Sequence, residues 1–274
     1  MANKPDFLAE HAVKALIDEA MLTPKPGLVD KNNSGAHKDL NLNLMLRSAN
    51  ALYETFWQIA EASSSQLPTK GLWKKLSQIG LKGEETMFKE TGGINTHKGA
   101  IWALGLLVCG AAMASEYSDT KNITTLASKI ACYNHISENM KVSNGFCACE
   151  NYGVTGARGE AKDAFPHVIN FALPSLYASR KQNASEHNSR LNALMALIAT
   201  VDDTCILHRG GMNALIITKK GAKEVIDNGG TSTRNGFNSL IKLDKTLMKM
   251  NVSPGGSADL LASTLFLDSI KNRR

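Results

Sequence analysis

The chain has 274 residues, of which 43% are hydrophobic and 20% are charged, proportions that exclude a disordered chain and suit a globular protein. Lys and Arg number 31 against 25 Asp and Glu, so the net charge is +6, a balance that suits polyanionic small ligands. Basic residues form no dense run before the last four residues, so we expect no nucleic-acid partner.

Apolar residues recur at helical spacing through most of the chain, beginning with residues 7–22. Pro24 and Pro26 end this first helix, because proline lacks the amide hydrogen that a helix needs. The same periodicity predicts further helices over residues 41–62, 73–90, 96–116, 120–140, 161–179, 189–201, 212–228, 237–250 and 257–270. Gly80 and Gly83 are expected to interrupt the third helix, and two prolines to bend the sixth.

Strand signals are weak, because no segment sustains the alternation of apolar and polar residues that a half-buried strand requires. Residues 215–218 are the one short candidate, and helix is favoured there too. The sequence therefore predicts an all-α fold, a compact bundle of roughly ten helices in a single domain over residues 1–274.

The cysteines and the apolar segments indicate a cytoplasmic protein. Five cysteines are scattered and odd in number, with no pair of CxxC motifs to hold zinc. The first 20 residues contain acids and no apolar core, so we expect no signal peptide. The longest apolar run, residues 101–114, is too short to cross a bilayer, so we expect no membrane partner.

Five segments at predicted helix ends combine glycine with a cation, a carboxylate or both: residues 23–39, 91–99, 152–161, 202–211 and 253–259. Glycine lets the backbone approach a ligand, and the free N–H groups of a helix N-terminus favour phosphate. One such segment alone is usually a turn and a cap. Five together favour an enzyme for a phosphate-bearing ligand, of a non-standard kind because GxxxxGK[ST], GxGxxG and GxSxG are all absent.

Single residues in these segments also have ordinary interpretations. Asp30 and Asp39 alone are typical surface acids or caps, and His97 alone is a satisfied, partly buried histidine. Four other histidines lack a glycine-rich context and are interpreted as structural or surface residues: His11, His135, His167 and His187.

At these residues the chain resembles triphosphoribosyl-dephospho-CoA synthases, which are associated with citrate lyase and have relatives that serve malonate decarboxylase. The similar segments are PKPGLVD with GAHKD, GINTHKGAIWALGLL, GARGEA, DDT with RGG, and SPGGSADLL. They occur in the family's order and extend from about Thr23 to Leu267. The family is all-helical, in agreement with the periodicity.

The resemblance implies a pentosyl transfer with ATP and 3′-dephospho-CoA as substrates. The 2′-hydroxyl of dephospho-CoA attacks C1′ of the ATP ribose, adenine leaves, and the triphosphate stays attached. The product then passes to a separate acyl-carrier-protein holo-synthase. Mg²⁺ is the expected cofactor, because a triphosphate needs cations around it. The oligomeric state is left open.

Residue chemistry suggests a role for each matching position. The candidate catalytic residues, as base, cation-stabilising carboxylate or proton donor to adenine, are Glu160, Asp203 and His97. The candidate phosphate-binding residues are Lys25, Lys98, Arg158, Arg209, Gly210, Gly211, Gly255, Gly256 and Ser257. The candidate Mg²⁺ ligands, direct or through water, are Asp30, Asp39 and Asp259.

One departure from the family leaves alternatives open. Cys147 stands where the family usually carries an arginine, so affinity or acceptor specificity is expected to differ. The alternatives are the same chemistry in malonate decarboxylase maturation, the same chemistry with another acceptor nucleotide, and a non-catalytic nucleotide-binding module that assists assembly of the lyase.

Overall fold

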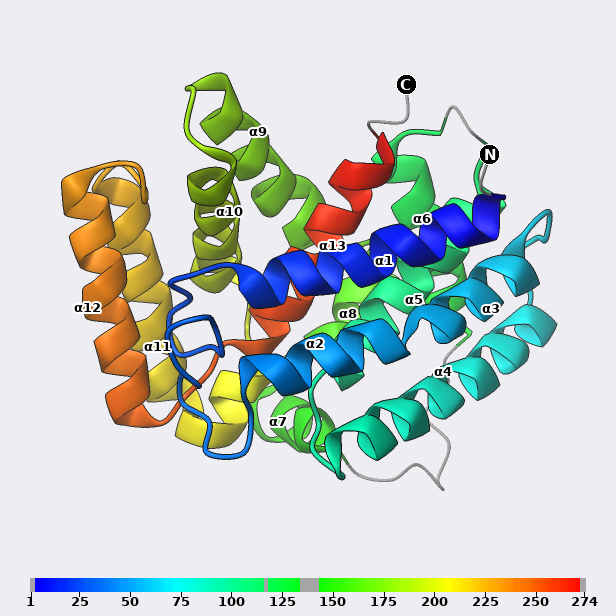
Figure 1. The fold of residues 1–274 in the computed structure, drawn as a ribbon, viewed down its shortest axis with the longest axis horizontal. Helices are drawn as coiled ribbons and strands as arrows, with labels where there is room; N and C mark the ends of the chain where they lie inside the picture. Colours follow the sequence, from blue (N-terminus) through cyan, green and yellow to red (C-terminus); the bar gives the residue numbers. More distant parts are fainter. Residues whose placement is uncertain (1–2, 116–117, 134–142, 272–274) are drawn as a thin grey trace.

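The computed structural model describes residues 3–115, 118–133 and 143–271. Its helices surround two buried central ones, α5 and α13 (Figure 1). In chain order the helices are α1 (Lys4–Met21), α2 (Leu42–Ala51), α3 (Tyr53–Ser63), α4 (Lys70–Thr91), α5 (Lys98–Met113), α6 (Thr120–Ala131), α7 (Asn144–Tyr152), α8 (Gly156–Lys162), the π-helix η1 (Val168–Ala172), α9 (Leu173–Lys181), α10 (Glu186–Thr200), α11 (Thr204–Asp227), α12 (Arg234–Met250) and α13 (Gly255–Lys271).

These helices confirm the all-α fold class. No strand occurs among the described residues, and the strand candidate at 215–218 lies inside α11. The single domain over residues 1–274 stays a prediction. No single described helix is long and apolar enough to cross a membrane, although α10 and α11, bent by 60° where they meet, pass that test as a pair.

The predicted helix over residues 41–62 is two helices, α2 and α3, which Leu52 separates. Conversely, the predicted interruptions at Gly80 and Gly83 are wrong, because α4 continues through both. A Cβ at Gly83 would lie 2.6 Å from Cγ2 of Thr55, so this glycine lets α3 and α4 approach each other. Its function in the fold is close packing rather than helix termination.

The middle of the chain departs most from the prediction. Residues 161–179 are not one helix, because α8 ends at Lys162 and the π-helix η1 leads into α9. The short helix α7 was not predicted, and α11 begins at Thr204, eight residues before its predicted start. The predicted helix over residues 120–140 is α6 up to Ala131, and its end lies outside the described residues.

The core forms around α5, whose apolar sequence predicted its burial. α5 packs against α1, α3, α6 and α13, and α13 continues the core toward α10 and α11. α11 and α12 form a hairpin at one edge of the molecule (Figure 1). Most residues of α5 and α13 are buried by neighbouring helices. The N-termini of these two helices are therefore rigid, and the loops that contact them are held in place.

Glycine substitutions on α4 and α5 are expected to have opposite effects on stability. A Cβ at Gly110 would lie 2.3 Å from the carbonyl oxygen of Ile123, so Gly110→Ala is expected to cost about 1–3 kcal/mol through overpacking. A Cβ at Gly80 would meet no atom within 4 Å, so Gly80→Ala is expected to gain about 0.5–1 kcal/mol of helix propensity. Urea unfolding of both variants measures the difference, and equal effects would contradict the α5–α6 packing.

Candidate functional site

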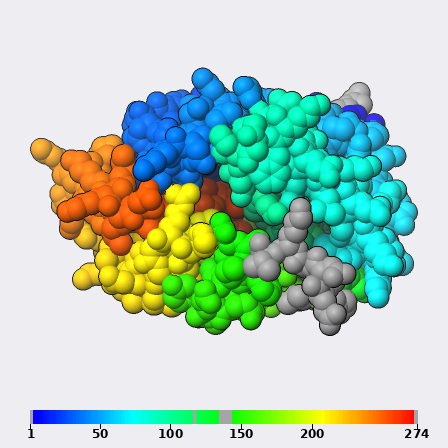
Figure 2. Space-filling model, turned by 90° about the horizontal axis from the view of Figure 1, so that it is seen from below, coloured from blue at the N-terminus to red at the C-terminus, as the bar shows by residue number. Residues whose placement is uncertain are grey.

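Four of the five glycine-containing segments meet around the N-terminus of α13. Figure 2 shows a hollow with part of α13 (dark red) at its floor. Its borders are residues 23–39 between α1 and α2, here called the first loop (blue), the end of α4 (teal), the start of α11 (yellow) and α7 (green). The N-termini of α5, α11 and α13 are tied together there by side-chain contacts. Segments that are far apart in the sequence therefore lie together at this hollow.

Asp203 joins two of these helices. Its Oδ1 accepts the N–H of Cys205 at 2.9 Å and of Gly256 at 3.3 Å, so it caps α11 and reaches α13. Its Oδ2 accepts both the N–H and the hydroxyl of Ser257, at 2.8 and 3.0 Å. Burial raises the pKa of the Asp203 carboxyl, and these hydrogen bonds act in the opposite direction. With both oxygens occupied, Asp203 stabilises the two helix ends as a cap.

Glu19 is a residue of this region that the sequence analysis missed. It lies in the last turn of α1 and accepts from Nζ of Lys25 at 2.5 Å, while the Glu19 carbonyl accepts from the same Nζ at 2.7 Å. The Lys25 and Glu19 side chains are only 1% and 5% exposed. Glu19 follows Ala12 and Leu16 on the buried face of α1, and a carboxylate in that apolar stripe was the available signal.

Lys25 therefore anchors the first loop to α1. Its amine is bound to Glu19 and so is not available to a phosphate. Its backbone N–H donates to Oδ2 of Asp30 at 3.0 Å. Oδ1 of Asp30 accepts from the backbone of Asn32 and Asn33, at 2.7 and 3.1 Å. Both carboxylate oxygens of Asp30, a predicted Mg²⁺ ligand, thus accept hydrogen bonds from the backbone of its own loop.

The same loop is held from two other helices. The backbone N–H of Gly27 donates to Asp244 of α12 at 2.9 Å. Arg209 of α11 donates to the carbonyl of Ala36 and to Nδ1 of His37, each at 3.2 Å. Burial, and then the charge of Arg209, lower the pKa of His37 to about 4, so its ring accepts this bond as a neutral imidazole.

His97 is buried at the start of α5, and its ring is only partly satisfied. Nδ1 shares a hydrogen bond with the Ser48 hydroxyl at 2.9 Å, whereas Nε2 is buried without a partner among the described residues. Burial, and then the charge of Lys25, lower the pKa of His97 to about 3. At neutral pH this imidazole is uncharged, so it suits a hydrogen bond to a ligand better than proton donation as an imidazolium.

Asp259 lies against the N-terminus of α5. The carboxylate accepts a hydrogen bond from the backbone of Ala100, and a Cβ at Gly99 would lie 2.0 Å from its Oδ2. Position 99 is therefore restricted to glycine by the close carboxylate. Burial raises the pKa of Asp259 well above its usual value, and the charges of Glu19 and Asp203 raise it further.

Glu160 pairs with a histidine that the sequence analysis set aside. Its Oε2 lies 2.6 Å from Nδ1 of His167, and its Oε1 accepts the backbone N–H of His167 at 3.0 Å. His167 stacks on Phe171 in η1, at 5.9 Å between ring centroids. His167, interpreted from the sequence as a structural or surface residue, thus holds a candidate catalytic carboxylate in place. Of the other three histidines interpreted as structural or surface residues, His135 lies outside the described residues.

Lys98, Arg158 and Arg209 lie nearer the surface than the buried Asp203. Nζ of Lys98 pairs with Glu84 at 2.8 Å and its side chain is 44% exposed. Arg209 is exposed apart from its contacts with the first loop, and Arg158 lies close enough to Cys149 to act on its pKa. Buried acids therefore lie below a rim of basic side chains.

The glycines of the fourth and fifth segments serve helix packing as well as ligand approach. Residues 202–211 lie mostly inside a helix and not in a loop between helices, because α11 begins at Thr204. Gly211, with a φ of +68°, kinks this helix. A Cβ at Gly210 would lie 2.5 Å from Cβ of Ala214, and one at Gly255 would lie 3.1 Å from Sγ of Cys205. These positions let α11 and α13 meet closely at Asp203.

The predicted metal ligands do not form one preassembled centre. Across the described ranges, no group of three or more His, Cys, Asp and Glu side chains is placed to hold a metal ion. Asp39 is exposed on the first loop, and Asp30 is saturated by backbone donors. Mg²⁺ needs only one or two protein carboxylates when phosphates supply the other ligands. The residues present thus suit a metal that arrives with a triphosphate as part of the substrate.

The chain matches the model of the CitG family, ATP:dephospho-CoA triphosphoribosyl transferase, over residues 5–274. The chain belongs to this family. It is 44% identical over 268 residues to the 2-(5″-triphosphoribosyl)-3′-dephosphocoenzyme-A synthase of Klebsiella pneumoniae, covering 98% of this chain and 96% of the relative. It is also 44% identical over 271 residues to the probable synthase of Pseudomonas syringae pv. tomato, covering 98% and 93%. No solved structure matches the chain.

Family membership makes this protein a transferase and confirms the resemblance on which the sequence analysis relied. The individual site residues stay predictions. The described placement brings the buried Asp203, His97 and Lys25 together with the half-buried Asp259, while Arg209 and Lys98 lie nearer the surface. Glu160 lies in α8 with its own partner, His167.

Removing the Asp203 carboxylate is expected to destabilise the protein as well as the site. Asp203→Ala leaves three backbone N–H groups and one hydroxyl without an acceptor, at an expected cost of at least about 2 kcal/mol. Asp202→Ala is the matched control, because Asp202 is more than half exposed and its ion pair in the described part of the chain is with Lys219, so the change should cost about 0.5 kcal/mol or less. Chemical denaturation compares the two, and equal losses would contradict the double-capping role.

His97 is expected to make the protein less stable in acid. Its pKa falls from 6.5 in the unfolded chain to about 3 in the folded one, so the unfolded state binds more protons below pH 6.5. Stability is then lost as pH falls, by about 2 kcal/mol between pH 7 and pH 5 for this one group. His97→Gln should reduce the pH dependence of unfolding by that amount, whatever its effect at pH 7. An unchanged pH dependence would argue against a buried, neutral His97.

Proposed function

We propose that this transferase joins the triphosphoribosyl part of ATP to 3′-dephospho-CoA with loss of adenine. The product is 2′-(5″-triphosphoribosyl)-3′-dephospho-CoA. The observation that carries this proposal is the arrangement of charge: the buried Asp203 and the half-buried Asp259 lie at the N-termini of α5, α11 and α13, and basic side chains lie nearer the surface. The chain's relatives are named for this product.

The basic rim suits the polyphosphate. Arg209 uses two of its five donors on the first loop and keeps the remaining donors for phosphate oxygens. Lys98 is half exposed, and exchange of its Glu84 partner for a phosphate keeps its charge paired. Mg²⁺ enters this proposal as part of Mg·ATP, with the exposed Asp39 as a ligand through water.

The buried acids suit the ribose. Breaking the bond between C1′ and adenine N9 builds positive charge on the sugar, and a nearby carboxylate lowers the energy of that state. The free Nε2 of His97 is placed to hydrogen-bond a polar group of a bound ligand, such as the base or a ribose hydroxyl. Glu160 and His167 are a second carboxylate–imidazole pair, suited to accept the proton of the attacking 2′-hydroxyl.

In this proposal the product supplies the citrate lyase prosthetic group through a separate acyl-carrier-protein holo-synthase, or the equivalent group of malonate decarboxylase. Cys147 favours one further candidate, a different acceptor nucleotide. It lies half-buried on α7, which packs against α11 beside the hollow, where relatives are expected to carry an arginine. The loss of that cation removes one phosphate contact.

Adenine release is the measurement that tests the proposal. The protein is incubated with Mg·ATP, with and without 3′-dephospho-CoA, and adenine is measured by chromatography while the mass of the CoA product is measured by mass spectrometry. We expect adenine only when the acceptor is present, in equal amount with a product heavier by one triphosphoribosyl unit. Coenzyme A and NADH are the control acceptors. Adenine release with one of these instead would favour the acceptor-swapped function, and none with any acceptor would overturn the proposal.

A further inference from the structure

The candidate carboxylates of the site differ in how much of their hydrogen-bonding capacity is already used. Asp203 accepts four hydrogen bonds from Cys205, Gly256 and Ser257. Glu160 accepts on both oxygens from His167. Asp203 cannot turn toward a ligand without leaving buried donors unpaired, which costs free energy, and Glu160 cannot turn without breaking its contacts with His167. These contacts make Asp203 a support of the site, and they leave Glu160 to act only together with His167.

Asp259 is the carboxylate with capacity to spare. Its contact is the N–H of Ala100, and none of the cations of the described chain forms an ion pair with it. It lies half-buried in the first turns of α13, the helix at the floor of the hollow (Figure 2). Gly99 gives it room, because any larger residue there would collide with Oδ2.

The buried ion pair of Glu19 and Lys25 lies near enough to Asp259 for the charge of Glu19 to raise the pKa of Asp259. α1 packs along α13, and the charge of Glu19 acts on Asp259. Lys25 neutralises Glu19, which leaves Asp259 and the capped Asp203 without a counter-cation in the described surroundings. His97, which is 2% exposed and feels the charge of Lys25, leaves Nε2 without a partner in the same part of the described chain. Buried acid in excess and an unsatisfied imidazole both indicate a polar, cationic occupant.

We propose that Asp259 is the catalytic carboxylate that faces C1′ of the ribose donor, and that Glu19 and Lys25 are its positioning residues. This inference rests on the proposed function and deepens it. Sequence analysis assigned Asp259 to Mg²⁺ and gave the carboxylate role to Glu160 or Asp203. The hydrogen bonds that already occupy Asp203 and Glu160 favour Asp259 for the role at C1′ instead.

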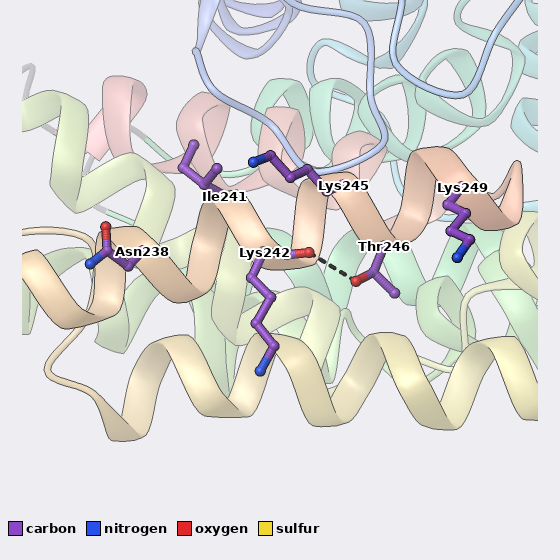
Figure 3. A pocket seen from close by; sticks show the side chains of 6 residues that line it. All are labelled: Asn238, Ile241, Lys242, Lys245, Thr246 and Lys249. Atoms are coloured by element: carbon purple, nitrogen blue, oxygen red, sulfur yellow. Dashed lines mark hydrogen bonds between the residues drawn. The ribbon is translucent and has the colours of Figure 1, made fainter.

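The step balances without a further reactant. The C1′–N9 bond breaks with its electron pair moving to adenine, and the acceptor 2′-oxygen forms the new bond to C1′. The proton of the 2′-hydroxyl leaves and, overall, appears on adenine. The Asp259 carboxylate remains unbonded and stabilises the positive charge that develops on the ribose between these two events. An open depression on α12 is lined by Lys242, Lys245 and Lys249 (Figure 3), and none of the residues of this step lies on α12.

Binding of a charged sugar mimic tests Asp259 apart from turnover. The probes are the 5′-triphosphate of a ribose-like pyrrolidine, whose ring nitrogen is protonated, and ribose 5-triphosphate, which is neutral at the same place. We expect the wild-type protein to bind the cationic probe more tightly. Asp259→Asn should weaken the cationic probe about 10-fold or more and change the neutral probe less than about 3-fold. Equal effects on both probes, or none, would overturn the assignment.

Turnover of the same variants gives a second readout. Asp259→Asn should lower kcat about 100-fold or more with little change in the KM for ATP, because the interaction strengthens only in the transition state. Glu160→Gln is the competing variant. If it loses the cationic probe and Asp259→Asn does not, the cation faces Glu160 and the inference fails. If wild-type protein binds neither probe and releases no adenine, the proposed function itself has failed.

The positioning pair needs a variant that separates structure from function. Glu19→Gln alone leaves Lys25 buried and unpaired, so the chain can lose its fold. The double variant with Glu19→Gln and Lys25→Met removes both charges together and should restore folding. If Glu19 and Lys25 serve only the fold, the folded double variant should keep the wild-type kcat. If they position Asp259, its kcat should fall about 10-fold or more with unchanged KM. Asp18→Asn, a neighbour on the outer side of α1, is the control and should keep full activity.

Discussion

The site depends on one buried carboxylate that caps two helices. Asp203 accepts from the first residues of α11 and from the first turn of α13, so two helix N-termini that are far apart in sequence meet at one side chain. A buried carboxylate without donors would be expelled or neutralised, and here four donors offset that cost. Gly255 and Gly256 follow from the same constraint, because a Cβ at either position would crowd Cys205 or Asp203.

The first loop is then fastened around this fixed point. Lys25 binds it to α1, Asp244 binds it to α12, and Arg209 binds it to α11. Each contact joins the loop to a different helix, so the loop that carries Asp39 at the rim has little freedom to move as a whole. The cost is that Lys25 and Asp30, which sequence analysis assigned to phosphate and metal, are consumed by the loop itself.

Periodicity predicted the fold well and the partners of the polar residues poorly. Helix spacing identified α1, α5, α10, α12 and α13 because each buries an apolar face of usual length. The break at Leu52 contains no glycine or proline, so no local signal marks it. Motifs located Asp203, Asp259 and Glu160, but whether a carboxylate caps, pairs or stays available depends on which helices meet it. Glu19 and His167 were missed for the same reason, since their importance comes from partners that only folding supplies.

The occupied helix ends also decide where a polyphosphate can bind. Sequence analysis placed phosphate at helix N-termini, where free N–H groups favour anions. Asp203 already fills that role for α11 and α13, and Asp259 fills it for α5. A phosphate at the floor would meet these carboxylates at close range and be repelled. The triphosphate is therefore better accommodated at the rim, near Arg209 and Lys98, which leaves the acidic floor for the sugar, the one part of the donor that becomes positive as adenine departs.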